Sequence, residues 1–121
     1  MNKKNLRFVV ALHVEAKPII SLYNLKKYKI RSKNFELYQN LSLNIWLVIS
    51  GVGNINASEA TKYLYQESPI NKKNIWINLG MAGSKNYNLG ETFNIKKVTY
   101  KSKSYYTSSL VNHIIPTGEI I

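Results

Sequence analysis

The segments IWLVI-SGVGNINA, at residues 45–57, and IWI-NLGMAG, at residues 75–83, contain the pattern that decides the fold. Each begins with an apolar run whose length and composition are typical of a buried strand. Glycines follow the run directly, where they permit a tight turn and let backbone N–H groups come close to a ligand. Because ligands bind at the carboxyl ends of the strands in open α/β sheets, these segments predict a site at one edge of a sheet.

The remaining hydrophobic pattern supplies the other elements of an α/β fold. Residues 6–12 are a continuous apolar run, which predicts a central strand covered on both faces. We expect the following order: a strand at 6–12, a helix at 15–25, a strand pair at 35–41 and 43–49, a helix that is capped by Asn54 or Asn56 and ends near Gln66, a short buried strand at 75–78, a loop at 83–90, and a strand at 92–100. Beyond residue 100 the only apolar patch is Ile114-Ile115.

Length and composition exclude several classes of protein. A chain of 121 residues has room for a single α/β domain, which we expect to span residues 1–121. The absence of cysteine excludes disulfides and thiolate metal sites, and the two histidines, His13 and His113, are too far apart for a local metal motif. The apolar runs are too short to span a membrane, and the amino terminus has no small-residue cleavage site. These features predict a cytoplasmic protein without a metal or cofactor.

The formal charge of +11 raises the question of a nucleic-acid partner. Of the seventeen basic residues only Arg7 and Arg31 are arginines, and asparagine, isoleucine and tyrosine are also abundant. All of these except arginine have AT-rich codons, so a genomic bias accounts for the charge. The densest basic cluster, at residues 26–33, falls where we expect a helix exit and a solvated loop. Since charge alone supports only non-specific contact, a nucleic-acid-binding domain is the weakest of the alternatives.

Glu15 is the acidic residue best placed for chemistry. The chain has six glutamates and no aspartate, and only Glu15 follows directly after a predicted central strand. It should therefore lie at the same sheet edge as the two glycine segments. A carboxylate there could act as a general base or hold a water molecule. It could equally complement the dipole of the helix that begins there.

The first glycine loop matches no phosphate-binding motif. Gly51-Val52-Gly53 is not followed by the Gly-Lys-Ser/Thr of a Walker loop, and Asn56 stands where a dinucleotide fingerprint has its third glycine. A tight strand-to-helix turn would explain these glycines as well as a ligand would. His13 could be a catalytic imidazole or a structural hydrogen-bonding group at a strand end. A Ser-His-Asp triad is excluded because the chain has no aspartate and no better-placed glutamate.

Four segments, in order, resemble the purine nucleoside phosphorylase and nucleosidase superfamily, over about residues 6–100. They are ALHVEAKP at 11–18, SGVGNINA at 50–57, NLGMAG at 78–83 and LGETF at 89–93. The greatest similarity is to the methylthioadenosine/S-adenosylhomocysteine nucleosidases. The resemblance implies a three-layer α/β fold with a central mixed sheet, and a protein that cleaves the N-ribosidic bond of a purine nucleoside or thionucleoside.

The resemblance also implies roles for particular residues. Glu15 matches the family glutamate that holds the attacking water. Ala82 and Gly83 match backbone positions that line the base and sugar pocket. Met81 of the same glycine segment, and Ser50 and Gly51 of the first glycine segment, are the other substrate-binding candidates. An oxocarbenium-like transition state would be stabilised by the nearby carboxylate. The implied ligand is a small purine nucleoside, with neither a membrane nor a nucleic acid as partner.

Two departures from the family pattern favour hydrolysis over phosphorolysis. Asn78 and Met81 stand where the hexameric phosphorylases carry the arginine and serine that hold phosphate. Without that cation and that hydroxyl, we expect water rather than phosphate to be the nucleophile. Met81 also replaces the serine common in nucleosidases, and Asn54 replaces the usual lysine of the first turn.

The length of the chain is the largest departure, because members of the superfamily are roughly twice as long. Their carboxyl half supplies a M-E-x-E segment that grips the ribose and an aspartate that protonates the leaving base. We therefore expect this chain to be the amino-terminal half of the family domain, and to associate with itself or with a complementing chain that covers its unfinished sheet. Lack of the general acid should cost on the order of 10²–10⁴-fold in rate. The alternative is a nucleoside-binding or vestigial module of the same fold that does not catalyse.

Overall fold

The computed structural model describes residues 3–28, 35–81, 90–107 and 117–120. The chain divides into two compact units, Met1–Met81 and Ala82–Ile121, which are described separately. In chain order the first unit contains β1 (Leu6–Val10), α1 (His13–Leu22), β2 (Lys26–Tyr28), β3 (Glu36–Asn40), β4 (Ile45–Ile49), α2 (Asn54–Glu67) and β5 (Ile75–Leu79). The second contains β6 (Asn94–Tyr100), β7 (Lys103–Tyr106) and β8 (Thr117–Ile120).

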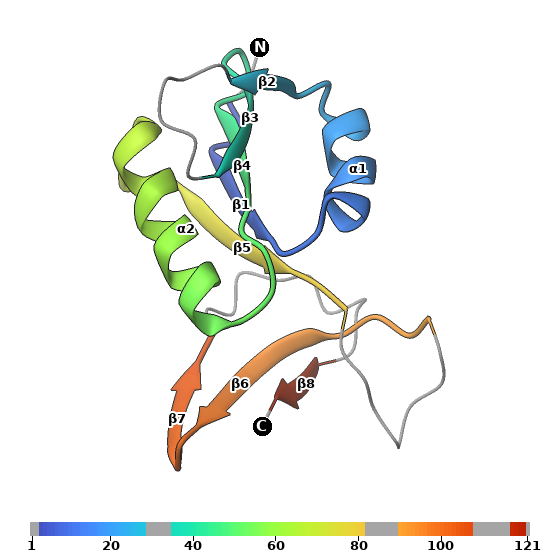
Figure 1. Ribbon diagram of the computed structural model, residues 1–121, viewed down its shortest axis with the longest axis vertical. Helices are drawn as coiled ribbons and strands as arrows, with labels where there is room; N and C mark the ends of the chain where they lie inside the picture. Colours follow the sequence, from blue (N-terminus) through green and yellow to red (C-terminus); the bar gives the residue numbers. More distant parts are fainter. Residues whose placement is uncertain (1–2, 29–34, 82–89, 108–116, 121) are drawn as a thin grey trace. The chain divides into compact units, whose positions relative to one another are not determined.

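The first unit is an α/β sandwich around a mixed sheet, as predicted. Its strand order is β2-β3-β4-β1-β5. β1 pairs in parallel with both β4 and β5, whereas β3 is antiparallel to β4 and β2 is antiparallel to β3. The two helices lie on opposite sides of this sheet (Figure 1), which gives three layers.

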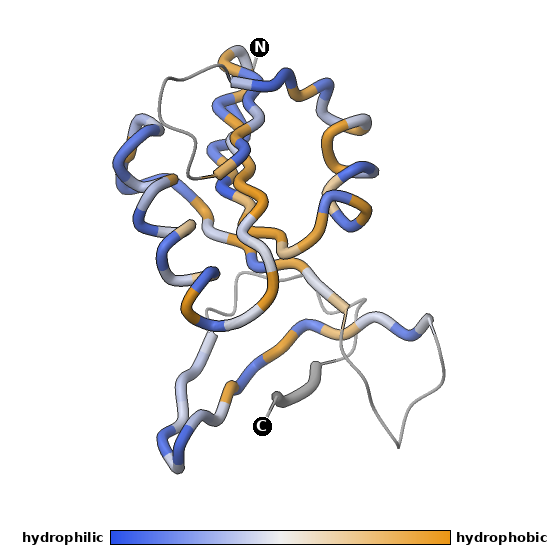
Figure 2. The backbone as a smooth tube through the Cα atoms, in the orientation of Figure 1, coloured by the Kyte–Doolittle hydropathy of each residue, from blue (hydrophilic) through white to orange (hydrophobic). Residues whose placement is uncertain are grey.

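Side-chain alternation along β1 and β4 divides the core into two halves. Phe8, Val10, Ile45 and Leu47 pack with α1 on one face, together with Ala16 and Ile19 of that helix. On the other face, Val9, Trp46 and Val48 pack with α2, through Ala60, Tyr63 and Leu64. Both central strands are therefore apolar on both sides, and their hydrophobic colour continues along the middle of the sheet (Figure 2).

An asparagine ends α1 earlier than the hydrophobic pattern predicts. The helix covers His13–Leu22 rather than 15–25, and it ends at Leu22 because Asn24 adopts φ +52°. The N–H of Leu25 donates to the carbonyl of Ile20 at 2.9 Å, and the N–H of Asn24 donates to that of Ser21 at 3.3 Å. This is a Schellman arrangement, in which the left-handed residue follows the helix and the next apolar side chain is buried.

Three further expectations about the first unit are wrong. The basic segment Lys26–Tyr28 is a strand, β2, and not a loop. The N-cap of α2 is Gly53 and not an asparagine; Asn56 instead donates to the carbonyl of Val52 at 2.8 Å. β5 is an edge strand with exposed apolar side chains, because no strand in the described part of the chain pairs with its outer side.

The second unit is a three-stranded sheet with the order β7-β6-β8. β6 is the strand expected at 92–100, whereas β7 and β8 were not predicted. β6 and β7 form an antiparallel hairpin whose two-residue turn, Lys101-Ser102, has positive φ at both positions, as in a type I′ turn. β8 pairs with β6 in parallel. The predicted loop over residues 83–90, apart from Gly90, as well as His113 and the patch at 114–115, lie outside the described residues.

A buried arginine joins the amino-terminal ends of the strands. The side chain of Arg7 is fully buried, and its guanidinium donates to Ser68 Oγ at 3.0 Å, to both the backbone and side-chain oxygens of Asn44 at 2.9 Å, and to the carbonyls of Leu6 and Pro69. Burial lowers the pKa of this guanidinium. Because no carboxylate is among these acceptors, the charge is held by neutral oxygens of β1, of the turn before β4 and of the end of α2.

Replacing this arginine should therefore weaken the fold. In Arg7→Met the buried Ser68 Oγ and the partly buried Asn44 Oδ1 lose the guanidinium that donates to them, and we expect the free energy of unfolding to fall by about 1–3 kcal/mol or more. Urea unfolding followed by circular dichroism measures this change. Lys17→Met, which removes an exposed cation from α1, should stay within about 0.5 kcal/mol of the wild type. Equal stability of the Arg7 and Lys17 variants would contradict the assignment.

Candidate functional site

The carboxyl ends of three parallel strands meet at one edge of the sheet. Val10, the last residue of β1, is in register with Ile49 of β4 on one side and with Leu79 of β5 on the other. The segments that follow these strands are therefore neighbours. They begin α1, form the first glycine loop and, at Gly80 and Met81, start the second, so the predicted meeting of these strand ends at one edge is confirmed.

The first glycine loop is joined to the end of β1 by its backbone. Ser50 N–H donates to the carbonyl of Val10 at 2.8 Å, and Gly51 N–H donates to that of Ala11 at 2.9 Å. Gly51 and Gly53 have φ of +81° and +102°, a region that other residues rarely adopt. The hydroxyl of Ser50, which is buried, donates to the carbonyl of Gly51 at 2.8 Å. The carbonyl of Val10 is 3.5 Å from the same hydroxyl, so both acceptors near the Ser50 proton belong to the backbone at this sheet edge.

Glu15 lies where the three segments meet. Its Oε1 accepts from the N–H of Leu12 at 3.0 Å, and its Oε2 accepts from the N–H of Met81 at 2.9 Å. Gly80 is beside it, since a Cβ built at that position would be 3.8 Å from Oε2. Glu15 is half-buried, so its carboxylate is anchored by backbone amides and still reaches the surface.

These contacts give Glu15 a structural role at the start of α1, as one of the two interpretations of the sequence predicted, and a second contact at the next loop. The bond to Leu12 is one half of a capping box, in which the third residue of the helix accepts from the N-cap amide. Leu12 has no side-chain acceptor for the reciprocal bond. The bond to Met81 has no part in a helix cap, and it brings the second glycine loop to the carboxylate. No signal in the sequence indicated this second contact.

The other predicted site residues are only partly described. The Met81 side chain is 78% exposed beside the carboxylate. Ala82 and Gly83 lie outside the described residues, so their expected contact with the base and sugar remains a prediction. Asn78 of β5 lines a cavity on the face of the sheet that carries α2.

His13, the first residue of α1, lies beside Tyr38 of β3. Its ring centroid is 6.1 Å from that of Tyr38, whose hydroxyl donates to Glu36 at 3.2 Å. Burial, the charge of Glu36 and this hydrogen bond together raise the pKa of Tyr38. Glu36 Oε1 also forms an ion pair, at 3.4 Å, with Nζ of Lys27 on the neighbouring strand β2. Among the interactions of the described residues, His13 therefore contacts an aromatic ring and does not contact Glu15.

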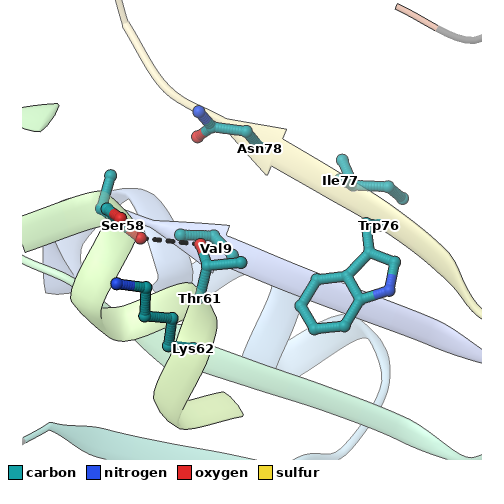
Figure 3. Close-up of a pocket in the computed structure, with 8 residues that line it drawn as sticks. Val9, Ser58, Thr61, Lys62, Trp76, Ile77 and Asn78 are labelled. Carbon is teal, nitrogen blue, oxygen red and sulfur yellow. Dashed lines mark hydrogen bonds between the residues drawn. The ribbon is translucent and has the colours of Figure 1, made fainter. Parts of the chain in front are cut away.

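A cavity of about 440 Å³ opens between α2 and β5 (Figure 3). Its lining is mostly apolar, and Thr61 Oγ1 donates to the carbonyl of Ala57 at 2.7 Å on its helical side. The lining residues are Val9, Ala57, Ser58, Thr61, Lys62, Trp76, Ile77 and Asn78. None of them is a carboxylate, and none belongs to the predicted catalytic or substrate set. The candidate site is therefore the sheet edge at Glu15, and this cavity is a separate feature.

Two properties of the described residues bear on other classes of function. No group of three or more histidine, cysteine, aspartate or glutamate side chains is close enough there to hold a metal ion. Among the helices that the structure describes, none has the length and hydropathy needed to cross a bilayer.

Comparisons with known proteins identify the fold. No protein-family model matches the sequence, and no curated protein matches it significantly. Solved structures do match. A Neisseria meningitidis 5′-methylthioadenosine/S-adenosylhomocysteine nucleosidase, in complex with methylthio-immucillin-A, is 23% identical with a TM-score of 0.61, over 77% of this chain and 40% of its own.

Two more structures of such nucleosidases match nearly the whole of this chain. A mutant of the Helicobacter pylori enzyme, with 5′-methylthioadenosine in its active site, is 14% identical with a TM-score of 0.72, over 95% of this chain and 62% of its own. The Chlamydia trachomatis protein is 22% identical with a TM-score of 0.64, over 98% of this chain and 58% of its own. The present chain thus spans about half the length of the structures it matches. Over that length, it has the α/β fold of the methylthioadenosine/S-adenosylhomocysteine nucleosidases.

Proposed function

We propose that this chain takes part in cleaving the N-ribosidic bond of a purine nucleoside or thionucleoside. The observation that carries the proposal is the position of Glu15, whose carboxylate lies where the ends of β1, β4 and β5 converge. The fold that surrounds it is shared with nucleosidases, two of which hold methylthioadenosine or a methylthio-immucillin. The proposed ligand is therefore a small purine nucleoside. The cytoplasmic location expected from the sequence remains a prediction.

The proposed reaction places positive charge on the ribose next to a carboxylate. The bond between C1′ and the base nitrogen breaks, a water oxygen bonds to C1′, and the base leaves with a proton. The ribose passes through an oxocarbenium-like state, which a nearby negative charge stabilises. Glu15 can hold the attacking water and accept its proton, because each carboxylate oxygen has acceptor capacity beyond its bond to a backbone amide.

Water is favoured over phosphate because of the groups present at the sheet edge. A phosphate site needs cations and multiple donors. The described hydrogen bonds around Glu15 and the first glycine loop involve backbone amides and no lysine or arginine. Asn78 and Met81 occupy the positions at which the resemblance would require arginine and serine.

The leaving base needs a proton donor, and the chain contains no aspartate to supply one. We propose that this group comes from a polypeptide segment that completes the fold, since the chain matches only 40–62% of the nucleosidases' length. The same observation supports the second candidate function, a nucleoside-binding module that does not catalyse. Turnover by the chain alone separates the two.

The outer edge of β5 is the surface that we propose for such association. Ile75, Trp76 and Leu79 are 37%, 37% and 42% exposed, and the strand is the last of its sheet among the described residues. Tyr65 of α2, also exposed, stacks on Trp76 with ring centroids 6.4 Å apart. An open strand edge with apolar side chains favours pairing with another chain.

The test of function is release of adenine from 5′-methylthioadenosine by the purified chain, with and without phosphate. Turnover that is independent of phosphate supports a nucleosidase. Turnover that requires phosphate contradicts the preference for water. Binding without turnover, measured by calorimetry, supports the non-catalytic module, and absence of both counts against a nucleoside ligand.

Glu15→Gln should reduce hydrolysis by roughly 10²–10⁴-fold, because the amide cannot accept a proton from water. The fold should persist, since the three-layer core does not include this side chain. Glu59→Gln is the matched control. Glu59 is exposed on α2 and contacts only Lys62 among the ion pairs described, at 3.8 Å. Retention of full activity by the Glu15 variant would remove this residue from the mechanism.

Light scattering of the purified protein should show a species larger than a monomer. Trp76→Lys should shift the population towards the monomer, because lysine on a strand edge opposes pairing. Leu22→Lys is the control, since Leu22 is 74% exposed on α1, at the opposite face of the sheet. A monodisperse monomer for the wild type, or equal effects of the two variants, would argue against an interface at β5.

A further inference from the structure

We infer that Glu15 is also a positioning residue, which latches the second glycine loop to the start of α1. The contact is read from the geometry alone, whereas its importance for a nucleoside rests on the proposed function. The latch consists of two hydrogen bonds that one carboxylate accepts from two backbone amides. These amides, of Leu12 and Met81, belong to different loops of the candidate site.

The two glycine loops are held at this edge in different ways. The first loop is tied to the end of β1 chiefly by backbone atoms, through Ser50 N–H to the carbonyl of Val10 and Gly51 N–H to that of Ala11, with only a long 3.5 Å contact from the Ser50 hydroxyl beside them. The second loop is tied through the Glu15 side chain, over a sequence separation of 66 residues. A substitution at position 15 can therefore release the second loop and leave the first in place. This asymmetry makes the latch accessible to experiment.

The local structure favours this arrangement. Oε1 is fixed by Leu12 N–H at the first turn of α1, so Oε2 is directed towards the end of β5. Gly80 has no side chain, and the carboxylate lies 3.8 Å from where its Cβ would be. A bond from an amide to a carboxylate is stronger than one to a neutral acceptor. The latch thus orients the carboxylate and holds the Met81 amide with the same contact.

The latch leaves the carboxylate able to bind a ligand. Each oxygen accepts one amide and retains a further lone pair for a water or a sugar hydroxyl. A ligand O–H at Oε2 would lie next to the Met81 amide, in a loop already positioned. Loss of the latch should therefore leave the Met81 amide without this acceptor even in the absence of ligand.

The chain is well suited to test this by NMR, because it contains only two methionines, Met1 and Met81. Labelling with ¹⁵N-methionine gives one backbone amide signal, that of Met81, since the amino group of Met1 exchanges rapidly with water. In the wild type we expect a signal shifted downfield and protected from exchange. In Glu15→Ala it should move upfield and exchange at least about tenfold faster, while the circular dichroism spectrum is unchanged. Glu59→Gln should leave the signal as in the wild type.

Two results would overturn the latch. One is an amide of Met81 that exchanges in the wild-type protein as fast as in an unstructured peptide, which needs no variant to observe. The other is an unchanged Met81 signal in a folded Glu15→Ala protein. A general loss of structure in the variant would change the circular dichroism spectrum together with the Met81 signal, and the exchange rate of this amide in the wild type then decides.

Addition of 5′-methylthioadenosine separates the latch from the proposed function. A further shift of the Met81 signal in the wild type, weakened in Glu15→Ala, supports both. A latched signal that does not respond to the nucleoside supports the latch and counts against the proposed function. A Met81 signal that exchanges freely but shifts when the nucleoside is added overturns the latch and still supports the proposed nucleoside site.

Discussion

The parallel pairing of β1 with both β4 and β5 is the constraint on which the rest of the structure depends. Because β1 is bonded on both sides, its register aligns the carboxyl ends of three strands at one edge. Its side chains alternate between the two halves of the core, so each helix has an apolar face to cover. Arg7 fastens the opposite end of the same strand to Asn44 and Ser68. One strand thus organises the layers, the core and the candidate site.

Much of this could be predicted from sequence, because buried strands and their glycine turns are local signals. The apolar runs at β1 and β4 and the helical spacing of the apolar residues in α2 indicated the elements and their order. Burial of β5 was predicted wrongly, since Ile75 and Trp76 are as apolar as the central strands and sequence does not show whether a neighbouring strand is present. The end of α1 depended on Asn24, whose left-handed conformation is compatible with the sequence but not required by it.

The candidate site was predictable to the extent that it follows from the sheet. Glu15 and the two glycine loops come directly after parallel strands, so their proximity follows from topology. The bond from Met81 N–H to Glu15 could not be predicted, because it depends on the path of the backbone after Leu79. The cavity beside Trp76 was also missed, since it arises from the packing of α2 on an edge strand.

The structural role of Glu15 and the catalytic role proposed for it are compatible, because they use different capacities of one carboxylate. Backbone amides take one lone pair on each oxygen and set the direction of the group, and the charge and the remaining lone pairs are left for a ligand. A carboxylate on a flexible side chain would have to be ordered when the ligand binds, at a cost in conformational entropy. Here that ordering already exists in the free protein. The contacts with the two amides would therefore orient the carboxylate for the proposed reaction. Helix capping and the proposed catalysis are thus compatible explanations for a glutamate at this position.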